Sequence, residues 1–132
     1  MGLQPADLAV DAPLVSQPGL YVGDTTAMAD DYADPSNCTG WSAAGNDAVF
    51  AIDLAGNQQL IADLTYLTAD PDAVMYISDD PSAPDTACLD GVDDVYDGTE
   101  SLTFTAPGPA TYYLVIDNYY TGGGPFEVML VF

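Results

Sequence analysis

The most concentrated chemistry in this sequence is a run of acidic side chains between Cys88 and Glu100. Its five carboxylates belong to Asp90, Asp93, Asp94, Asp97 and Glu100. Gly91 and Gly98 allow the chain to bend tightly between them. Calcium takes about six to eight oxygen ligands, and carboxylates and main-chain carbonyls are its usual donors. We therefore predict a Ca²⁺ site in this loop. Its spacing is not that of an EF-hand, and the alternative is a solvated acidic surface.

Two further groups of acids are candidate calcium sites. One group comes together if the two cysteines are joined, and its members are Asp30, Asp31 and Asp34 with Asp79 or Asp80. The other group lies at the opposite end of the domain, and its members are Asp47, Asp70 and Asp72. Aspartate is common in turns, where its side chain bonds its own backbone. Ordinary turn chemistry is therefore the alternative for both groups, and for Asp72 in particular.

The charge of the whole chain is the reason to expect bound cations. The 132 residues include 21 acids and no Lys, Arg or His, which gives a formal net charge of −21. Ion pairs between side chains are therefore excluded, as is electrostatic binding to nucleic-acid phosphates or anionic lipid headgroups. Self-repulsion opposes the compact state unless counter-ions or bound metals offset it.

The same composition argues against catalysis. A Ser or Cys nucleophile here has neither a histidine or lysine base nor a cationic group to stabilise developing charge. Two carboxylates suffice for glycoside hydrolysis, but no spacing singles out such a pair. We predict that the protein is not an enzyme.

The two cysteines, Cys38 and Cys88, are candidates for one disulfide. In an oxidising compartment this bridge would close a loop of about 50 residues and contribute roughly 4 kcal/mol. Two buried free thiols are the alternative. The composition is typical of an extracellular protein, so we favour the disulfide and expect a secreted or cell-surface location.

Hydrophobic residues make up 48% of the chain and recur with a period of two. The expected strands lie within residues 19–28, 48–54, 59–67, 73–80, 101–106, 111–120 and 126–132. Gly, Pro and Asp separate them, and no segment has convincing helical periodicity. This pattern predicts an all-β, jelly-roll-like antiparallel β-sandwich over residues 16–132. No apolar run reaches the length of about 18 residues that a membrane span needs.

Residues 1–15 form a separate N-terminal arm in this interpretation. In an extended chain its apolar face comprises Leu8, Val10, Ala12 and Leu14, and Asp7 and Asp11 lie on the other face. An apolar strand face needs a groove to fill. The arm either folds back onto its own sandwich or inserts into a neighbouring subunit by strand addition.

Exposed aromatic residues are the remaining candidates for ligand contacts. Consecutive strand residues face opposite ways, so neither Tyr112–Tyr113 nor Tyr119–Tyr120 is expected to form one platform. Trp41 lies in an expected loop and is the better candidate for a sugar or protein contact. Loop packing is the alternative for Trp41.

Several segments resemble the bacterial pre-peptidase C-terminal domain over roughly residues 18–132. They are GNDAVFAIDLAGNQQLIADLTY, DPDAVMYIS, CLDG, GTESLTFTAPGPATYYLVIDNY and GGGPFEVMLVF. The markers are Asp47, Asp72 and the GPATYYLVID segment, which has one residue more between Gly and Tyr than the family pattern. The resemblance implies a small, secreted jelly roll that often binds calcium and usually accompanies an enzyme without being catalytic.

The preferred hypothesis is an extracellular structural subunit, loaded with Ca²⁺, that polymerises with itself. Its arm would complete the sheet of a neighbour, with Leu8, Val10, Ala12 and Leu14 in the groove. Asp7 and Asp11 would meet carboxylates across the junction through calcium. The alternative is a monomeric accessory domain of a secreted enzyme that contacts a polysaccharide or a matrix protein.

Overall fold

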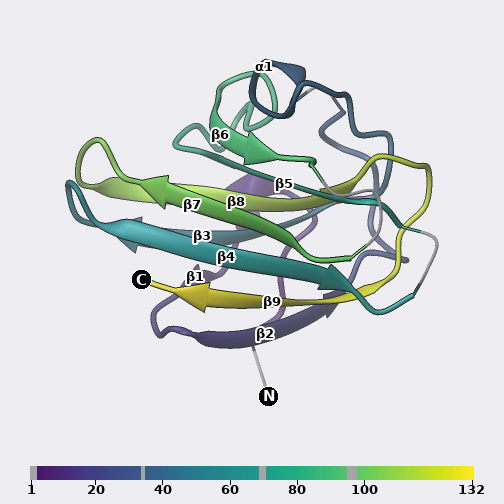
Figure 1. Ribbon diagram of the computed structural model, residues 1–132, viewed down its shortest axis with the longest axis horizontal. Helices are drawn as coiled ribbons and strands as arrows, with labels where there is room; N and C mark the ends of the chain where they lie inside the picture. The colour runs from purple at the N-terminus through teal and green to yellow at the C-terminus, as the bar shows by residue number, and fades with distance from the viewer. Residues whose placement is uncertain (1–2, 34, 69–70, 95–97) are drawn as a thin grey trace.

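Two β-sheets packed face to face make up the computed structural model, which describes residues 3–33, 35–68, 71–94 and 98–132 (Figure 1). The five-stranded sheet has the order β1 (Leu14–Val15), β3 (Ala48–Leu54), β8 (Ala110–Asn118), β5 (Ala73–Ser78), β6 (Cys88–Val92). The four-stranded sheet has the order β2 (Gly19–Asp24), β9 (Pro125–Val131), β4 (Gln59–Tyr66), β7 (Glu100–Thr105). The predicted all-β sandwich is confirmed.

Burial differs between the two sheets. Along β4 and β7, buried residues alternate with more exposed ones, because only one face of the four-stranded sheet packs on the core. All six residues of β5 are buried, because the five-stranded sheet is covered on both faces. Its inner face joins the main core between the sheets. Its outer face joins a second cluster, whose buried members are Ala9, Tyr32, Ala43, Val49, Val74, Tyr76, Cys88 and Val115.

The strand pairing departs from the expected antiparallel pattern at one edge. β1 runs parallel to β3, with Leu14 opposite Ala51, and the other pairs of named strands are antiparallel. The chain passes from the five-stranded to the four-stranded sheet between β1 and β2. Because β2 lies between β1 and β3 in the sequence, these two strands are not joined by a hairpin and can run in the same direction.

Two elements lie in segments that the sequence predicted as loops. They are α1 (Ser36–Thr39) and the edge strand β6. β6 mixes buried and exposed residues without regular alternation, and it pairs with β5 through an irregular register near Ile77. In the part of the chain that the structure describes, no helix has the length and apolar character to cross a bilayer.

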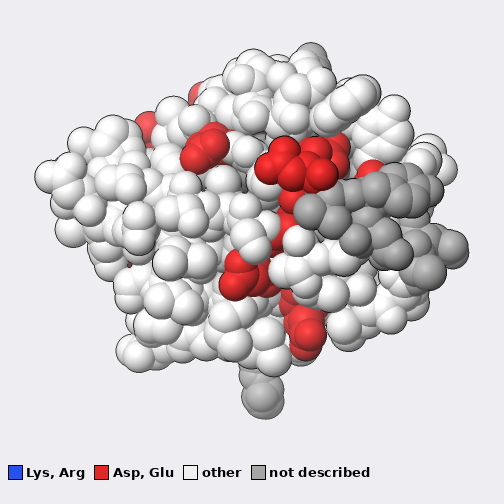
Figure 2. Space-filling model, viewed as in Figure 1, with Lys and Arg blue, Asp and Glu red and all other residues white. Residues whose placement is uncertain are grey.

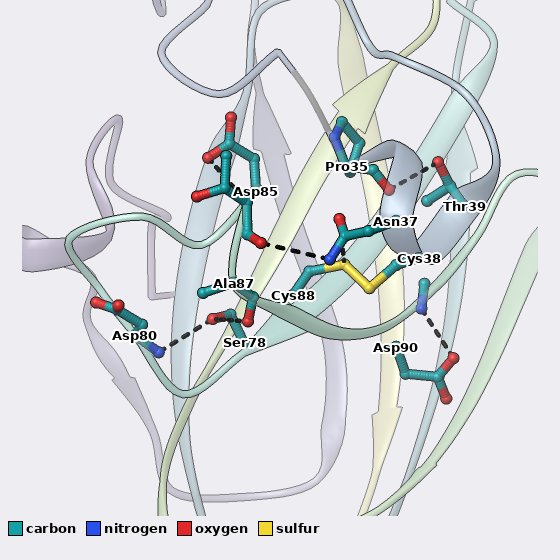
Figure 3. The surroundings of a disulfide bond; sticks show 12 residues. Pro35, Asn37, Cys38, Thr39, Ser78, Asp80, Asp85, Ala87, Cys88 and Asp90 are labelled. Carbon is teal, nitrogen blue, oxygen red and sulfur yellow. Dashed lines mark hydrogen bonds between the residues drawn. A yellow bond between two sulfur atoms is a disulfide. The ribbon is translucent and has the colours of Figure 1, made fainter.

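The disulfide between Cys38 and Cys88 is present and joins α1 to β6 (Figure 3). The two residues are 50 positions apart, and their Cα atoms lie 6.2 Å from each other. Gly91 allows α1 to approach β6 closely. A Cβ atom at Gly91 would lie 2.8 Å from Thr39 Cγ2 and 3.1 Å from Cys38 Cβ.

The N-terminal arm lies along its own sandwich from Leu3 onward, but not as a continuous strand. Ala6 forms an isolated bridge with Val49, and a 3₁₀ turn follows at η1 (Ala9–Asp11). This turn breaks the two-residue period, so the predicted apolar face is wrong. Ala9 is buried, whereas the exposed fractions of Leu8, Val10 and Leu14 are 39%, 64% and 48%. Ala12 packs partly against the second cluster.

Candidate metal site

Two groups of carboxylates converge among the described residues, and neither is one of the three predicted groups. The first group, here called the arm site, comprises Asp7, Asp31 and Asp47. The second, here called the strand-end site, comprises Asp72, Asp93 and Glu100. In each group the carboxylate oxygens lie within 4.8 Å of one another. Each observed group therefore combines residues from different predicted sites, and the arm site also includes Asp7 from the N-terminal arm.

Three segments far apart in the sequence build the arm site. Asp7 comes from the arm, Asp31 from the loop before α1, and Asp47 from the residue just before β3. The backbone N–H groups of Asp31 and Tyr32 donate to Asp47 Oδ2 at 3.0 and 2.9 Å. The N–H of Ala29 donates to Asp7 Oδ1 at 2.9 Å. These bonds fix the loop against both carboxylates.

Asp47 is fully buried, with an exposed fraction of 0%. Burial raises its pKa to about 8, the nearby charge of Asp31 adds to this, and the Tyr32 and Asp31 N–H groups oppose it. Asp47 Oδ1 is buried and accepts no hydrogen bond from the described residues. An acceptor in this position is costly to bury unless a donor or a cation meets it.

The charged form of Asp31 is also disfavoured, although Asp31 is more exposed than Asp47. Burial raises the pKa of Asp31, and its contact with Asp7 raises it further. Three carboxylates therefore share a small volume that contains no basic side chain. Their oxygens are hard donors, which is the chemistry that Ca²⁺ prefers.

The strand-end site lies where three strands begin or end. Asp72 precedes β5, Asp93 follows β6, and Glu100 opens β7. Asp72 and Glu100 are buried, with exposed fractions of 7% and 1%. Burial raises the pKa of Asp93 to about 6, and the charges of Asp72 and Glu100 add to this effect.

The other predicted ligands do not join either group. Asp90 accepts from its neighbour Gly91 N, and Asp80 accepts from Ser82 N and Oγ. The disulfide forms, but neither Asp79 nor Asp80 joins Asp31 in a group of carboxylates. Asp79 and Asp94 are exposed and outside both groups, as is Asp30. The predicted ligands Asp34, Asp70 and Asp97 lie outside the described residues.

The sequence analysis expects Asp7 to meet carboxylates of a neighbouring subunit through calcium, whereas in the structure Asp7 lies beside Asp31 and Asp47 of its own chain. A second acid of this region has no role in the sequence analysis. Asp117 was not singled out, yet it is fully buried on β8 and accepts from Tyr76 Oη at 3.3 Å and from Asn118 N at 2.8 Å. Burial raises the pKa of Asp117 well above its usual range, and the charge of Asp47 adds to this. The available signal was a single acid in an otherwise apolar strand.

The charge is also visible on the surface. Figure 2 shows acidic side chains gathered in a band across the face that carries β4, β7 and β9, with no basic side chain among them. This face therefore repels anions and attracts cations.

The aromatic pairs behave differently from each other. Tyr112 is buried and Tyr113 is only partly so, which agrees with alternation along β8. Tyr119 and Tyr120 are both exposed, by 37% and 43%, because β8 ends at Asn118 and the alternation ends with it. Both side chains of this second pair therefore lie at the surface, and neither packs in the core.

The sequence from β3 to β8 matches a known family. The family model for the bacterial pre-peptidase C-terminal domain matches residues 46–118, more than half of the chain. This chain belongs to that family. The matched segment of this pre-peptidase C-terminal domain includes Asp47 and all three residues of the strand-end site, but not Asp7 or Asp31.

Solved structures support the same fold. The pre-peptidase C-terminal domain of collagenase from Bacillus anthracis aligns with a TM-score of 0.62 and 13% identity, covering 92% of this chain and 95% of that one. CorA, described as a surface-associated copper-binding protein of Methylomicrobium album BG8, aligns with a TM-score of 0.58 and 10% identity, covering 98% and 99%. No curated protein sequence matches this pre-peptidase C-terminal domain. At these identities the likeness concerns the fold alone.

Proposed function

We propose that this protein is a non-catalytic, extracellular calcium-binding module, in which an ion at the arm site ties the arm to the sandwich. The observation that carries the proposal is Asp47, whose buried Oδ1 accepts no hydrogen bond from the described residues. One carboxylate oxygen of Asp47 also lies within 4.8 Å of one oxygen each from Asp7 and Asp31. A cation there would offset both the burial of Asp47 and its repulsion from Asp7 and Asp31. Because Asp7 belongs to the arm, the ion would couple the arm to β3.

The donor chemistry favours calcium over a transition metal. Copper and zinc sites use imidazole or thiolate ligands. This chain has no His, and its two Cys form the disulfide. Carboxylates suit Ca²⁺, whose remaining positions are filled by main-chain carbonyls and water. The copper binding stated for CorA therefore has no counterpart in the ligands of the arm site.

The same features support the proposed extracellular location and the proposed absence of catalysis. The disulfide is of the kind that persists in oxidising compartments. Family members are accessory domains without catalysis of their own, and a chain without His, Lys or Arg offers few catalytic groups. We therefore place the protein outside the cytoplasm in a binding or structural role.

Thermal unfolding of metal-stripped protein, with and without added CaCl2, tests the proposal. The wild type is expected to melt several degrees higher in calcium, because a ligand at about 100 times its Kd stabilises by about 2.7 kcal/mol. Asp47→Asn and Asp7→Asn should lose most of this shift. Asp11→Asn is the matched control, since it removes the same charge from the same arm outside both sites.

Calorimetric titration with CaCl2 separates the two groups of carboxylates. If Asp47→Asn and Asp7→Asn kept the wild-type shift and affinity, the arm site would not be the calcium site. If Asp93→Asn alone abolished the shift, the ion would belong to the strand-end site.

A second candidate function is self-assembly by exchange of the arm. The favouring observation is how little of the arm is buried: of its described residues, Pro5, Ala9 and Val15 are buried, while Leu8, Val10 and Leu14 are exposed. A groove of about 550 Å³ also lies between the arm and the free edge of β2. Transfer of the arm to the β3 edge of a neighbour would recreate its pairing and build a filament. Size-exclusion chromatography in calcium measures the assembly.

A further inference from the structure

An exposed cluster of three aromatic side chains lies outside both metal sites. Its members are Trp41, Tyr119 and Tyr120, and we call them the aromatic corner. Their exposed fractions are 56%, 37% and 43%. The ring centroids of Trp41 and Tyr119 are 6.2 Å apart at an interplanar angle of 89°, and those of Tyr119 and Tyr120 are 5.2 Å apart at 81°. Successive rings therefore stand at right angles.

The backbone holds the aromatic corner in place without a ligand. Trp41 N donates to Thr39 Oγ1 at 3.2 Å, and Thr39 Oγ1 donates to Trp41 O at 2.8 Å. The segment that follows Trp41 is bonded to the segment that carries the tyrosines, because Ala44 N donates to Tyr119 O at 3.3 Å. The pairs Gly45 N to Asn118 O and Asn46 N to Gly122 O continue this alignment at 3.0 and 2.7 Å.

The geometry favours a cation over a sugar. A sugar chain stacks on broad, roughly coplanar ring faces, and the edge-to-face packing of these three rings offers no such platform. Each ring face carries partial negative charge and attracts an ammonium or guanidinium group, and Trp attracts it most strongly. The net charge of −21 repels anionic ligands and concentrates cationic ones at the surface.

The sequence also restricts the source of the cation. A second copy of this chain offers no Lys, Arg or His side chain. We infer that Trp41, Tyr119 and Tyr120 form a binding site for the Lys or Arg side chains of a different, basic polypeptide. Long-range attraction brings the partner to the acidic surface, and the rings then hold individual side chains.

A titration with a lysine-rich peptide tests this inference, with calcium-saturated protein at about 0.15 M NaCl, where charges are screened beyond about 8 Å. Trp41 is the only tryptophan, so its fluorescence should change on binding. Calorimetry should show that Trp41→Leu weakens binding roughly tenfold, with Trp41→Phe in between, because Phe attracts a cation less strongly than Trp. Leu89→Ala is the control, because Leu89 is as exposed as Tyr120 and lies on β6. Its affinity should stay within about twofold of wild type, since it removes no ring and no charge.

Three results would overturn the inference. One is absence of peptide binding by the wild type. Another is equal affinity of Trp41→Leu and wild type, which would leave only general attraction to the acidic surface. The last is binding of a neutral oligosaccharide, but not of the peptide, at Trp41. Circular dichroism of each variant confirms that it is folded. The arm site shares no residue with the aromatic corner, so either proposal can fail alone.

Discussion

At the scale of single residues, this protein buries carboxylates that have few compensating donors. Asp47 and Asp117 are both fully buried, and burial is the largest cause of the raised pKa of each. Both carboxyls belong to the layer over the outer face of the five-stranded sheet. Asp117 shares that face with Val115, which is two residues earlier on β8 and belongs to the second cluster. If calcium binds at the arm site as proposed, it competes with protons for these carboxylates.

The pH dependence of metal-free protein follows from the sign of these shifts. A buried acid with a raised pKa keeps its proton in the folded state after the unfolded chain has lost it. The free energy of unfolding should therefore fall as pH rises from about 4, the unfolded value, towards about 8, where Asp47 titrates. Urea unfolding in chelator at several pH values measures this slope.

Asp47→Asn isolates the contribution of Asp47. It should flatten the slope and make the metal-free protein more stable than wild type at pH 8. The gain should be at least about 1 kcal/mol for each unit by which the pKa of Asp47 is higher in the folded than in the unfolded state. Saturating calcium should also flatten the wild-type slope. A metal-free stability that rises with pH across this range would contradict the prediction.

At the scale of elements, α1 and β6 depend on each other. Neither has a strong local signal: α1 spans four residues, and β6 is an edge strand with irregular burial. The disulfide joins them, and Asn37 Nδ2 donates to Thr86 O at 3.4 Å beside it (Figure 3). Tyr76 of β5 pairs with Gly91 of β6 and is completely buried. It belongs to the cluster that includes Cys88, and Cys38 packs against this cluster. The close approach at Gly91 makes this contact possible.

Gly91→Ala should separate the two elements. The added methyl group has no room against Thr39 and Cys38, so we expect a loss of about 1–3 kcal/mol, as in other overpacked sites. Thermal unfolding of the oxidised protein measures it. Gly108→Ala is the matched control, because a Cβ at Gly108 meets open space. Equal melting temperatures for the two variants would show that α1 is free to move away from β6.

At the scale of the whole molecule, the net charge of −21 opposes self-association. Like charges repel two copies at every contact, and no basic side chain can offset this. Any self-association must therefore use apolar surface together with bound cations. Apolar surface is available on the outer face near the β2 edge, where Leu20, Val22, Met129 and Val131 are each at least 40% exposed.

If the arm exchanges between copies, assembly should require both calcium and residues 1–15. Size-exclusion chromatography should show large species in calcium and a 13.8 kDa monomer in chelator. A variant lacking residues 1–15 should stay monomeric in both. A wild-type monomer at every calcium concentration would exclude filament formation and leave the arm-site proposal standing. Assembly of the shortened variant would assign it to another surface.

The strands show how far local pattern extends. The segments that became β3, β4, β7, β8 and β9 alternate or run apolar in the sequence, and the structure has strands there. The segment of β6 carries no such pattern, because an edge strand is specified mainly by the neighbour with which it pairs. The arm misled for a related reason: its alternating residues suggested one apolar face, and the 3₁₀ turn at Ala9–Asp11 removed it.

By itself, the sequence determined the layered β architecture and the net charge of −21, since side-chain alternation and total charge are independent of how distant segments pack. It also offered the one cysteine pair that became the disulfide. Only the tertiary structure decided which carboxylates meet. Asp7, Asp31 and Asp47 come together because the arm and one loop fold over the same end of β3, and no local pattern encodes that approach. Burial of Asp47 beneath that loop, which makes its charge costly, is likewise a property of the packed molecule.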